Sequence, residues 1–120
     1  MEQIRFTTRV LGPIAAYRLE QEQVTQTLRG YSHDITQAIL TGRLRVGDQI
    51  QVILDDRMVG LAQYVILDTT WLDNLTTEDA RRGGFDSVND LVLALKRAGY
   101  RFRPIDQYNF YRIQFSWLVE

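Results

Sequence analysis

Residues 75–95 read LTTEDARRGGFDSVNDLVLAL and decide the fold class, because this stretch specifies where two helices begin and end. Thr76 is suited to cap a first helix, and Asp79, three residues further on, completes a capping box. The pair Gly83-Gly84 then ends the helix, since glycine adopts the left-handed backbone conformation at little cost. The sequence therefore predicts a short helix that begins at Thr76 and ends at Gly83.

A second helix follows within the same stretch. Ser87 is suited to cap it, and Gly99 is placed to end it, so the helix is predicted over residues 87–98. Its apolar residues recur at helical spacing, at Val88, Leu91, Val92 and Leu95. A helix pair between two strand-rich parts of the chain indicates an α+β domain.

The rest of the chain alternates mainly as strands do. Gly12-Pro13 is suited to open a helix, since proline at the first helical position loses no useful N–H, although residues 14–19 also fit a strand. Ser32 is suited to cap a further short helix that ends at Gly42. The predicted strands cover residues 4–10, 24–28, 49–54, 58–67 and 108–119.

About six strands with one inserted helix pair suit a small, curved, mostly antiparallel barrel. Alternate side chains of such a barrel fill its interior, and most of the aromatic residues are expected there. The predicted interior positions are Phe6, Val24, Ile50, Val52, Tyr64, Ile66, Phe110 and Phe115.

The composition narrows the class of protein. A chain of 120 residues has room for one domain, and without cysteine it has neither disulfides nor thiolate metal ligands. One histidine, His33, gives little basis for an imidazole metal centre, so neither a metal site nor a cofactor is predicted. Without a signal peptide or a run of about 18 apolar residues, the protein is expected to be cytoplasmic, with no membrane contact.

The charge pattern is the next clue. The formal charge is −1, which argues against a general polyanion binder, yet 13 of the 14 basic residues are arginine. Guanidinium groups suit phosphates and base edges better than ammonium groups do, although codon or thermal bias also explains the preference. The arginines are spread along the chain, so any basic patch must be assembled by folding.

Several motifs, taken in order, resemble one known family. Residues 25–29 read TQTLR, an alternating T-x-T-x-R pattern, and residues 46–52 read VGDQIQV, a Gly-Asp turn that leads into a strand. IRFTTR at 4–9 precedes them, and LTTEDA at 75–80 follows. In this order they resemble an ASCH domain, a small member of the PUA-like superfamily. The resemblance implies one domain over residues 1–120, a PUA-like/ASCH curved, mostly antiparallel β-barrel with flanking helices.

The same resemblance bears on catalysis. ASCH-like amidohydrolases that act on acetylated cytidine carry a lysine, a threonine and a glutamate in one cleft. The threonine falls on Thr27, but the lysine position is Val24 and the glutamate position is Gly83, so two of the three are chemically empty. An enzyme that uses Thr27 with Glu78 or Asp79 stays an alternative, since a hydroxyl nucleophile needs a neighbouring base.

Arg29 is the strongest candidate for ligand binding. It closes the T-x-T-x-R strand, and Thr27 two residues before it points to the same side. The resemblance places this side at the cleft of the family, where a guanidinium offers a fixed fork to a phosphate or a base edge. The alternative is an ion pair with an acid such as Asp48.

Five further residues are weaker candidates. Arg43 and Arg45 lie on either side of a leucine and share one face if the segment is a strand. Arg81 and Arg82 follow the first capped helix, although paired arginines are usually only solvated. Trp71 stands at a strand exit, where it can stack on a base or plug the barrel.

Three functions remain from this reasoning. The favoured hypothesis is a non-catalytic nucleic-acid-binding module, for RNA or a modified nucleotide, that uses a cleft between the barrel and the helices. The first alternative is a small amidohydrolase acting on an acylated nucleoside. The second is a protein-interaction module with a vestigial cleft, which predicts an exposed apolar patch of several hundred square ångström.

Overall fold

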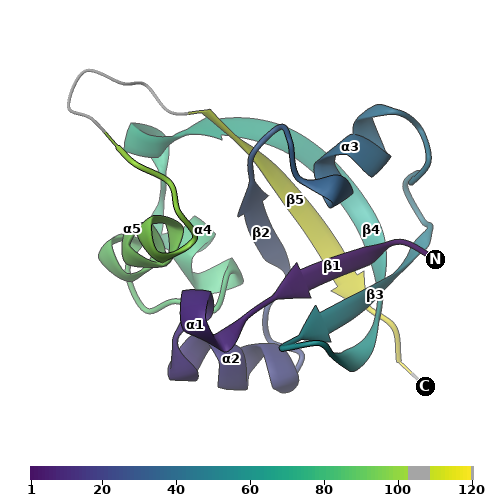
Figure 1. Ribbon diagram of the computed structural model, residues 1–120, viewed down its shortest axis with the longest axis horizontal. Helices are drawn as coiled ribbons and strands as arrows, with labels where there is room; N and C mark the ends of the chain where they lie inside the picture. Colours follow the sequence, from purple (N-terminus) through teal and green to yellow (C-terminus); the bar gives the residue numbers. More distant parts are fainter. Residues whose placement is uncertain (103–108, 120) are drawn as a thin grey trace.

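The computed structural model describes residues 1–102 and 109–119, and it forms one curved sheet with helices packed around its ends (Figure 1). The class is α+β, as the helix pair indicated. Among these residues, no helix is long and apolar enough to cross a bilayer. The elements are β1 (Gln3–Phe6), α1 (Thr8–Leu11), α2 (Pro13–Glu20), β2 (Gln26–Arg29), α3 (Asp34–Leu40), β3 (Gln49–Leu54), β4 (Arg57–Trp71), a 3-10 helix (Leu72–Asn74), α4 (Thr77–Arg82), α5 (Val88–Arg97) and β5 (Asn109–Trp117).

The sheet has five described strands in the order β1-β3-β4-β5-β2. Three neighbouring pairs are antiparallel, and the edge strand β1 runs parallel to β3. The two edges, β1 and β2, are not paired with each other in the described part of the chain, so the sheet is open and the expected barrel is not confirmed. The gap between these two edge strands, here called the seam, is where the candidate functional site lies.

The helix pair is confirmed at both ends. Thr76 caps α4 in a complete capping box, in which its hydroxyl accepts a hydrogen bond from the backbone N–H of Asp79 and the Asp79 carboxylate accepts one from that of Thr76. Gly84, with φ of +92°, reverses the chain after α4. Ser87 caps α5 through the backbone N–H of Asp90. All of these contacts join residues close in sequence, which is why the sequence predicts them.

Two expectations about the N-terminal part are corrected. The predicted strand over residues 4–10 ends at Phe6, because Thr7 caps the one-turn helix α1 and accepts a hydrogen bond from the Val10 N–H at 3.3 Å. Residues 14–19 form helix α2, which begins at Pro13, so the strand alternative is wrong there.

The last strand ends at Trp117, and Tyr108, its predicted start, lies outside the described residues.

The core lies on the concave side of the sheet and contains seven of the eight predicted interior residues. Ile66 is the exception, with 48% of its surface exposed. A register shift after Tyr64 leaves Val65 without a partner on β5, so the alternation of inside and outside changes phase. A β-bulge of this kind places Val65 and Ile66 both on the outer face, which simple alternation does not foresee.

Candidate functional site

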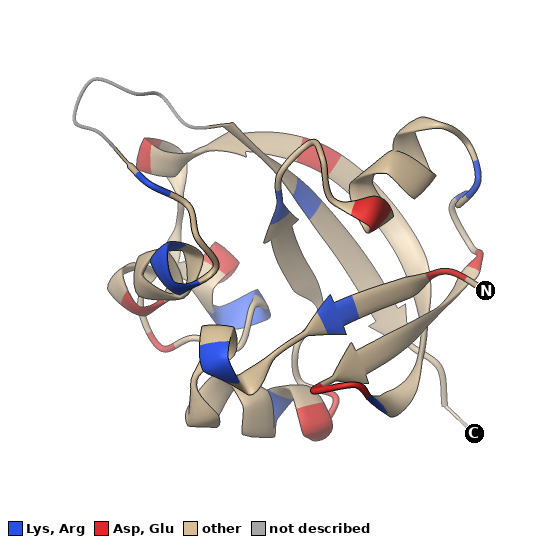
Figure 2. Ribbon diagram, viewed as in Figure 1, with Lys and Arg blue, Asp and Glu red and all other residues tan. Residues whose placement is uncertain are grey.

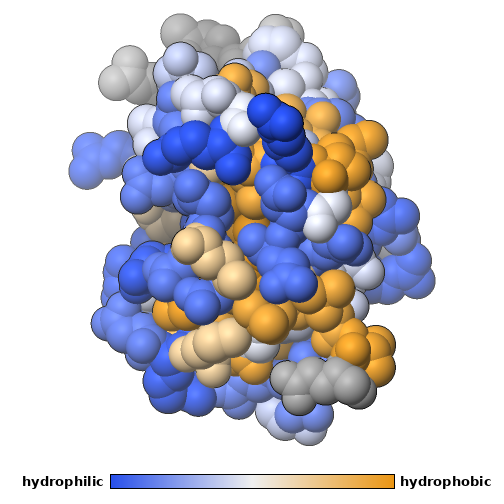
Figure 3. All heavy atoms as spheres, turned by 90° about the vertical axis from the view of Figure 1, so that its right-hand side faces the viewer, coloured by the Kyte–Doolittle hydropathy of each residue, from blue (hydrophilic) through white to orange (hydrophobic). Residues whose placement is uncertain are grey.

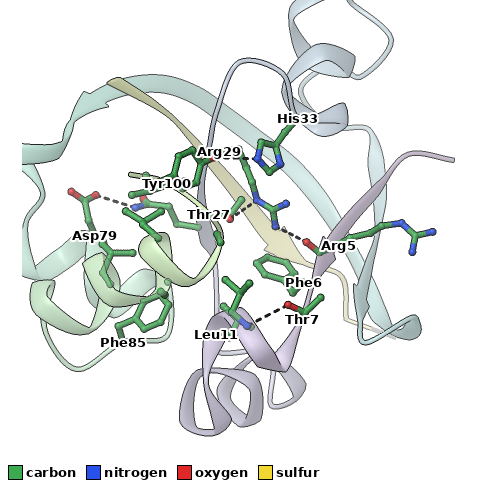
Figure 4. Close-up of a pocket in the computed structure, with 18 of the residues that line it drawn as sticks. Arg5, Phe6, Thr7, Leu11, Thr27, Arg29, His33, Asp79, Phe85 and Tyr100 are labelled. Atoms are coloured by element: carbon green, nitrogen blue, oxygen red, sulfur yellow. Dashed lines mark hydrogen bonds between the residues drawn. The ribbon is translucent and has the colours of Figure 1, made fainter. Parts of the chain in front are cut away.

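A cavity of about 250 Å³ lies at the open seam between β1 and β2. Helix α1 and helix α5 close two of its sides, and Figure 4 shows side chains from all four elements pointing toward one another there. Its apolar wall comes from Phe6, Leu11, Phe85, Leu91, Ala94 and Leu95. All six of these residues are buried, so the base of the cavity is apolar, whereas its mouth is formed by exposed residues such as Thr7 and Arg9.

Arg29 is the central polar residue of the cavity. Its Nε donates a hydrogen bond to the Thr27 hydroxyl at 3.0 Å, and its Nη2 donates one to the Arg5 carbonyl at 2.7 Å. The guanidinium carbon lies 4.9 Å from the centre of the Phe6 ring, a cation–π distance. The side chain therefore reaches from β2 across the seam to β1, as Figure 4 shows.

No carboxylate of the described residues forms an ion pair with Arg29. The expected alternative partner, Asp48, instead accepts a hydrogen bond from the backbone N–H of Arg45 at 2.8 Å. Loss of solvent lowers the pKa of Arg29 to about 10, and the nearby phenol of Tyr100 opposes this shift. Arg29 thus stays charged at neutral pH, and its charge faces an apolar cavity uncompensated.

Thr27 lies beside Arg29 on the same face of β2, as predicted, and also lines the cavity. Its oxygen accepts the hydrogen bond from Arg29, which leaves the hydroxyl proton available to an acceptor. Among the described residues, no base accepts that proton. Thr27 is therefore arranged as a hydrogen-bond donor, and it lacks the activation that a nucleophile needs.

His33 and Tyr100 complete the cavity, and the sequence did not identify either as a site residue. The Tyr100 hydroxyl accepts a hydrogen bond from the Gly30 N–H at 2.9 Å and lies 3.1 Å from His33 Nε2. Gly30 permits this approach, because an added Cβ would lie 3.2 Å from the tyrosine oxygen. Burial and the Arg29 charge lower the pKa of His33, while Asp34 opposes them, so the imidazole is neutral at neutral pH.

His33, and not the expected Ser32, occupies the N-cap position of α3, and its side chain makes no capping hydrogen bond. The ring is instead stacked near Tyr100, with 6.4 Å between the ring centres. A single histidine that follows a serine carries no sequence signal for this role. The contact depends on residues 67 positions apart.

Asp79 also lines the cavity, but its oxygens already have partners. They accept hydrogen bonds from Gln26 Nε2 at 3.0 Å, from Arg112 Nη1 at 2.9 Å and from Thr76. Burial by itself raises the pKa of Asp79, yet these donors outweigh it and hold the pKa below its usual value. An ionised carboxylate held by three donors is a structural group and a poor general base.

The other predicted arginines lie away from the cavity. Arg43 forms a long ion pair with Glu2, with 3.9 Å between Nε and Oε1, and Arg45 is exposed in the loop before β3. Arg81 and Arg82 both pair with Glu78 on the outer side of α4. The structure thus brings Thr27 and Arg29 together, and it does not bring these four arginines to the same site.

Trp71 stands at the end of β4 with 41% of its surface exposed, and it does not line the cavity. Of the two other positions compared with the amidohydrolases, Gly83 lines the cavity and Val24 is fully buried. Glu78, the other acid of the enzymatic alternative, is occupied by two arginines. In the described part of the chain, no cluster of three metal-ligating side chains occurs.

Two solved structures have a fold similar to this one, although the sequence comparisons found no match. No family model matches the sequence, and no curated protein is similar enough to count as a match. The ASCH domain from Lactobacillus crispatus aligns with a TM-score of 0.54 at 13% identity, over 87% of this chain and 70% of that chain. A DUF984 protein from Enterococcus faecalis gives a TM-score of 0.54 at 13% identity, over 84% of this chain and 67% of that chain. The fold is ASCH-like.

At this identity the likeness concerns the fold alone. It confirms the resemblance that the order of motifs suggested, with the seam cavity placed between the edge strands and α5 of the ASCH-like fold. The functional argument has to come from the residues of this chain, above all from Arg29 and the apolar wall opposite it.

Proposed function

We propose that this ASCH-like domain is a non-catalytic module that binds one nucleotide of single-stranded RNA, ordinary or modified, in the seam cavity. The observation that carries the proposal is the uncompensated guanidinium of Arg29, which faces an apolar cavity of about 250 Å³. An apolar pocket with a few fixed polar groups is the usual form of a small-ligand site. Sequence-specific RNA binding commonly takes an unstacked base into such a pocket.

The size and the polar groups favour a base over a larger ligand. Small-molecule pockets usually measure about 300–1,000 Å³, so this cavity suits a single ring system. Arg29 has donors beyond those that Thr27 and Arg5 use, and a guanidinium can donate two parallel hydrogen bonds to a base edge. The Thr27 hydroxyl adds one more donor beside it. The apolar side chains of α1 and α5 supply the surface for the faces of the ring.

The amidohydrolase alternative has no supporting observation, because none of the described residues accepts a hydrogen bond from the Thr27 hydroxyl and the carboxylate of Asp79 is occupied. The protein-interaction alternative rests on exposed apolar residues. Figure 3 shows apolar side chains on one face of the molecule with hydrophilic ones between them, and Val46, Val65 and Ile66 are among the exposed residues. No feature of that face identifies a partner, so RNA binding is the function that we carry forward.

The test is a binding assay. Fluorescence anisotropy with short single-stranded RNAs of each base, at about 50 mM salt, measures affinity for the wild type and for Arg29→Lys. The lysine keeps the charge and loses the two-pronged geometry, so affinity is expected to fall by about 1–3 kcal/mol. Arg57→Gln is the control, since Arg57 is exposed on the β3–β4 hairpin and pairs with Glu20. Wild-type protein that binds none of the RNAs refutes the proposal.

A further inference from the structure

The arginines of the described chain fall into two groups. Seven form ion pairs with carboxylates, whereas five have no carboxylate of the described residues within 4.0 Å. The paired group is Arg5, Arg18, Arg43, Arg57, Arg81, Arg82 and Arg112, and the unpaired group is Arg9, Arg29, Arg45, Arg97 and Arg101. Two of these five, Arg9 and Arg29, line the seam cavity. Arg97 contacts the backbone of Val10 and Leu11 in α1.

Arg9 lies in the single turn of α1, is exposed, and lines the cavity. Its only described hydrogen bond is a long one, from Nη1 to the backbone carbonyl of Arg97 at 3.4 Å. Most of its five N–H donors are therefore free at the mouth. Arg9 and Arg29 line the same cavity, so one ligand can contact both.

Arg97 stands on the opposite side of the α1–α5 contact, in the last turn of α5. Its Nε donates to the Val10 carbonyl at 2.7 Å, and its Nη2 donates to the Leu11 carbonyl at 3.3 Å. Backbone carbonyls orient Arg97, but they do not neutralise its charge.

The charges at the cavity that have no described partner are all positive. Of the charged residues that line the cavity, Arg5 is paired with Asp56 and Asp79 with Arg112, which leaves Arg9 and Arg29 without counter-charge. Figure 2 shows the blue segments of α1 and of the C-terminal part of α5 facing each other beside the seam. Two arginines without a described carboxylate partner therefore line one cavity, although the net charge of the chain is −1.

We infer that Arg9 forms a phosphate subsite at the mouth of the base pocket, so that the ligand is a nucleotide with its phosphate and not a free nucleoside. The inference rests on the proposed function and extends it. Guanidinium groups bind phosphate through paired, charge-assisted hydrogen bonds, and Arg9 offers its free N–H donors at the mouth of the cavity. The base occupies the apolar cavity beside Arg29, and the phosphate lies at the mouth beside Arg9.

The experiment compares three ligand forms of the base that the wild-type protein binds best: the nucleoside, its monophosphate, and a short single-stranded RNA. Isothermal titration gives the affinity of each form, and the RNA is also titrated between about 50 and 200 mM salt. The variant is Arg9→Gln, chosen because the Arg9 side chain is exposed and makes only one long described hydrogen bond. Arg57→Gln is the charge-matched control, because it removes the same charge away from the cavity.

The wild type is expected to bind the monophosphate and the RNA at least about tenfold more tightly than the nucleoside, a factor that corresponds to about one charged hydrogen bond. Arg9→Gln should remove most of this gain, leave nucleoside affinity within about twofold, and reduce the salt slope for RNA by about 0.7, the value for one phosphate on a single strand. A gain for both phosphate-bearing ligands assigns the subsite to the ligand's own phosphate. A gain for RNA alone assigns it to a neighbouring backbone phosphate.

Equal affinity for nucleoside and monophosphate with no added gain for RNA overturns the inference while the base pocket stands. The same conclusion follows if Arg9→Gln leaves the salt slope unchanged or weakens the nucleoside as much as the RNA. Absence of binding to every ligand form refutes the proposed function itself.

Discussion

Replacement of Arg29 by methionine separates a binding role from a structural one. Methionine keeps an unbranched side chain of similar reach and removes the charge and the hydrogen bonds. Arg29 bridges the edge strands through its contact with the Arg5 carbonyl, so a purely structural arginine predicts a large loss of stability on substitution. A ligand-binding arginine predicts a large loss of affinity with little change in the fold.

The magnitude follows from two opposed contributions. Because one pKa unit corresponds to about 1.4 kcal/mol, the lowering from 12.5 to about 10 means that the cavity disfavours the charged form by about 3 kcal/mol. The hydrogen bonds to Thr27 and Arg5 offset this at about 1.5 kcal/mol each, the lower value for charged partners. The two nearly cancel, so Arg29→Met is expected to change the free energy of unfolding by less than about 2 kcal/mol.

The assay combines urea unfolding with RNA anisotropy on the same preparations. A change of 1 kcal/mol shifts the melting temperature of a domain of this size by about 3–6 °C, so thermal unfolding is sensitive enough. Affinity should fall at least about tenfold, while Arg57→Gln alters neither property by a comparable amount. Should Arg29→Met lose more than about 4 kcal/mol of stability and still bind RNA normally when folded, the argument for an uncompensated ligand-binding charge is refuted.

Three further predictions concern residues that shape the site. Asp79→Asn breaks a buried ion pair and a capping box, so urea unfolding should give a loss of about 3 kcal/mol, and a loss below about 1 kcal/mol contradicts its structural role. The lowered pKa of His33 means that the unfolded chain takes up a proton first, so stability should fall as the pH drops below 6.5, by at most about 1.4 kcal/mol per pH unit. His33→Gln should remove most of this dependence of stability on pH, and an unchanged dependence contradicts its assignment to His33. Gly84→Ala should lose about 2–4 kcal/mol, because the backbone is strained for other residues and the new Cβ would lie 2.9 Å from Val24 Cγ2. Gly99→Ala, with φ of +106° and open space around it, isolates the backbone strain at about 1–2 kcal/mol, and equal losses for the two would exclude the clash.

Prediction from sequence succeeded where the determinants are local. Thr76 and Ser87 cap helices through residues three positions away, so their roles can be predicted without a tertiary structure. The prediction from sequence was wrong at Thr7, which was expected in a strand and caps a helix, and at Ile66, which was expected in the interior and is exposed. The chain after Phe6 is polar enough to continue a strand or to cap a helix, and the Thr8 contacts with Asp55 hold the helical choice. The bulge at Val65 depends on the register with β5, which no alternation within β4 reveals.

The candidate site shows the same division. Thr27 and Arg29 lie two residues apart on one strand, so their shared direction follows from strand geometry. Whether Arg29 finds an acid, a carbonyl or an apolar cavity depends on which distant elements fold against it. The acidic partners expected for it and the arginine pairs expected beside it lie elsewhere, and Arg9 takes its place through the packing of α1 on α5.

The sequence by itself determined the α+β class, the helix pair with its caps, and the direction of Thr27 and Arg29, because each depends on contacts within a few residues of the chain. Tertiary structure alone decided that the sheet stays open between β1 and β2 and that Arg29 reaches across this seam to the Arg5 carbonyl. It also decided that Tyr100 meets His33 across 67 positions of sequence. Such long-range contacts depend on the register and packing of whole elements, which local patterns of charge and hydrophobicity do not encode.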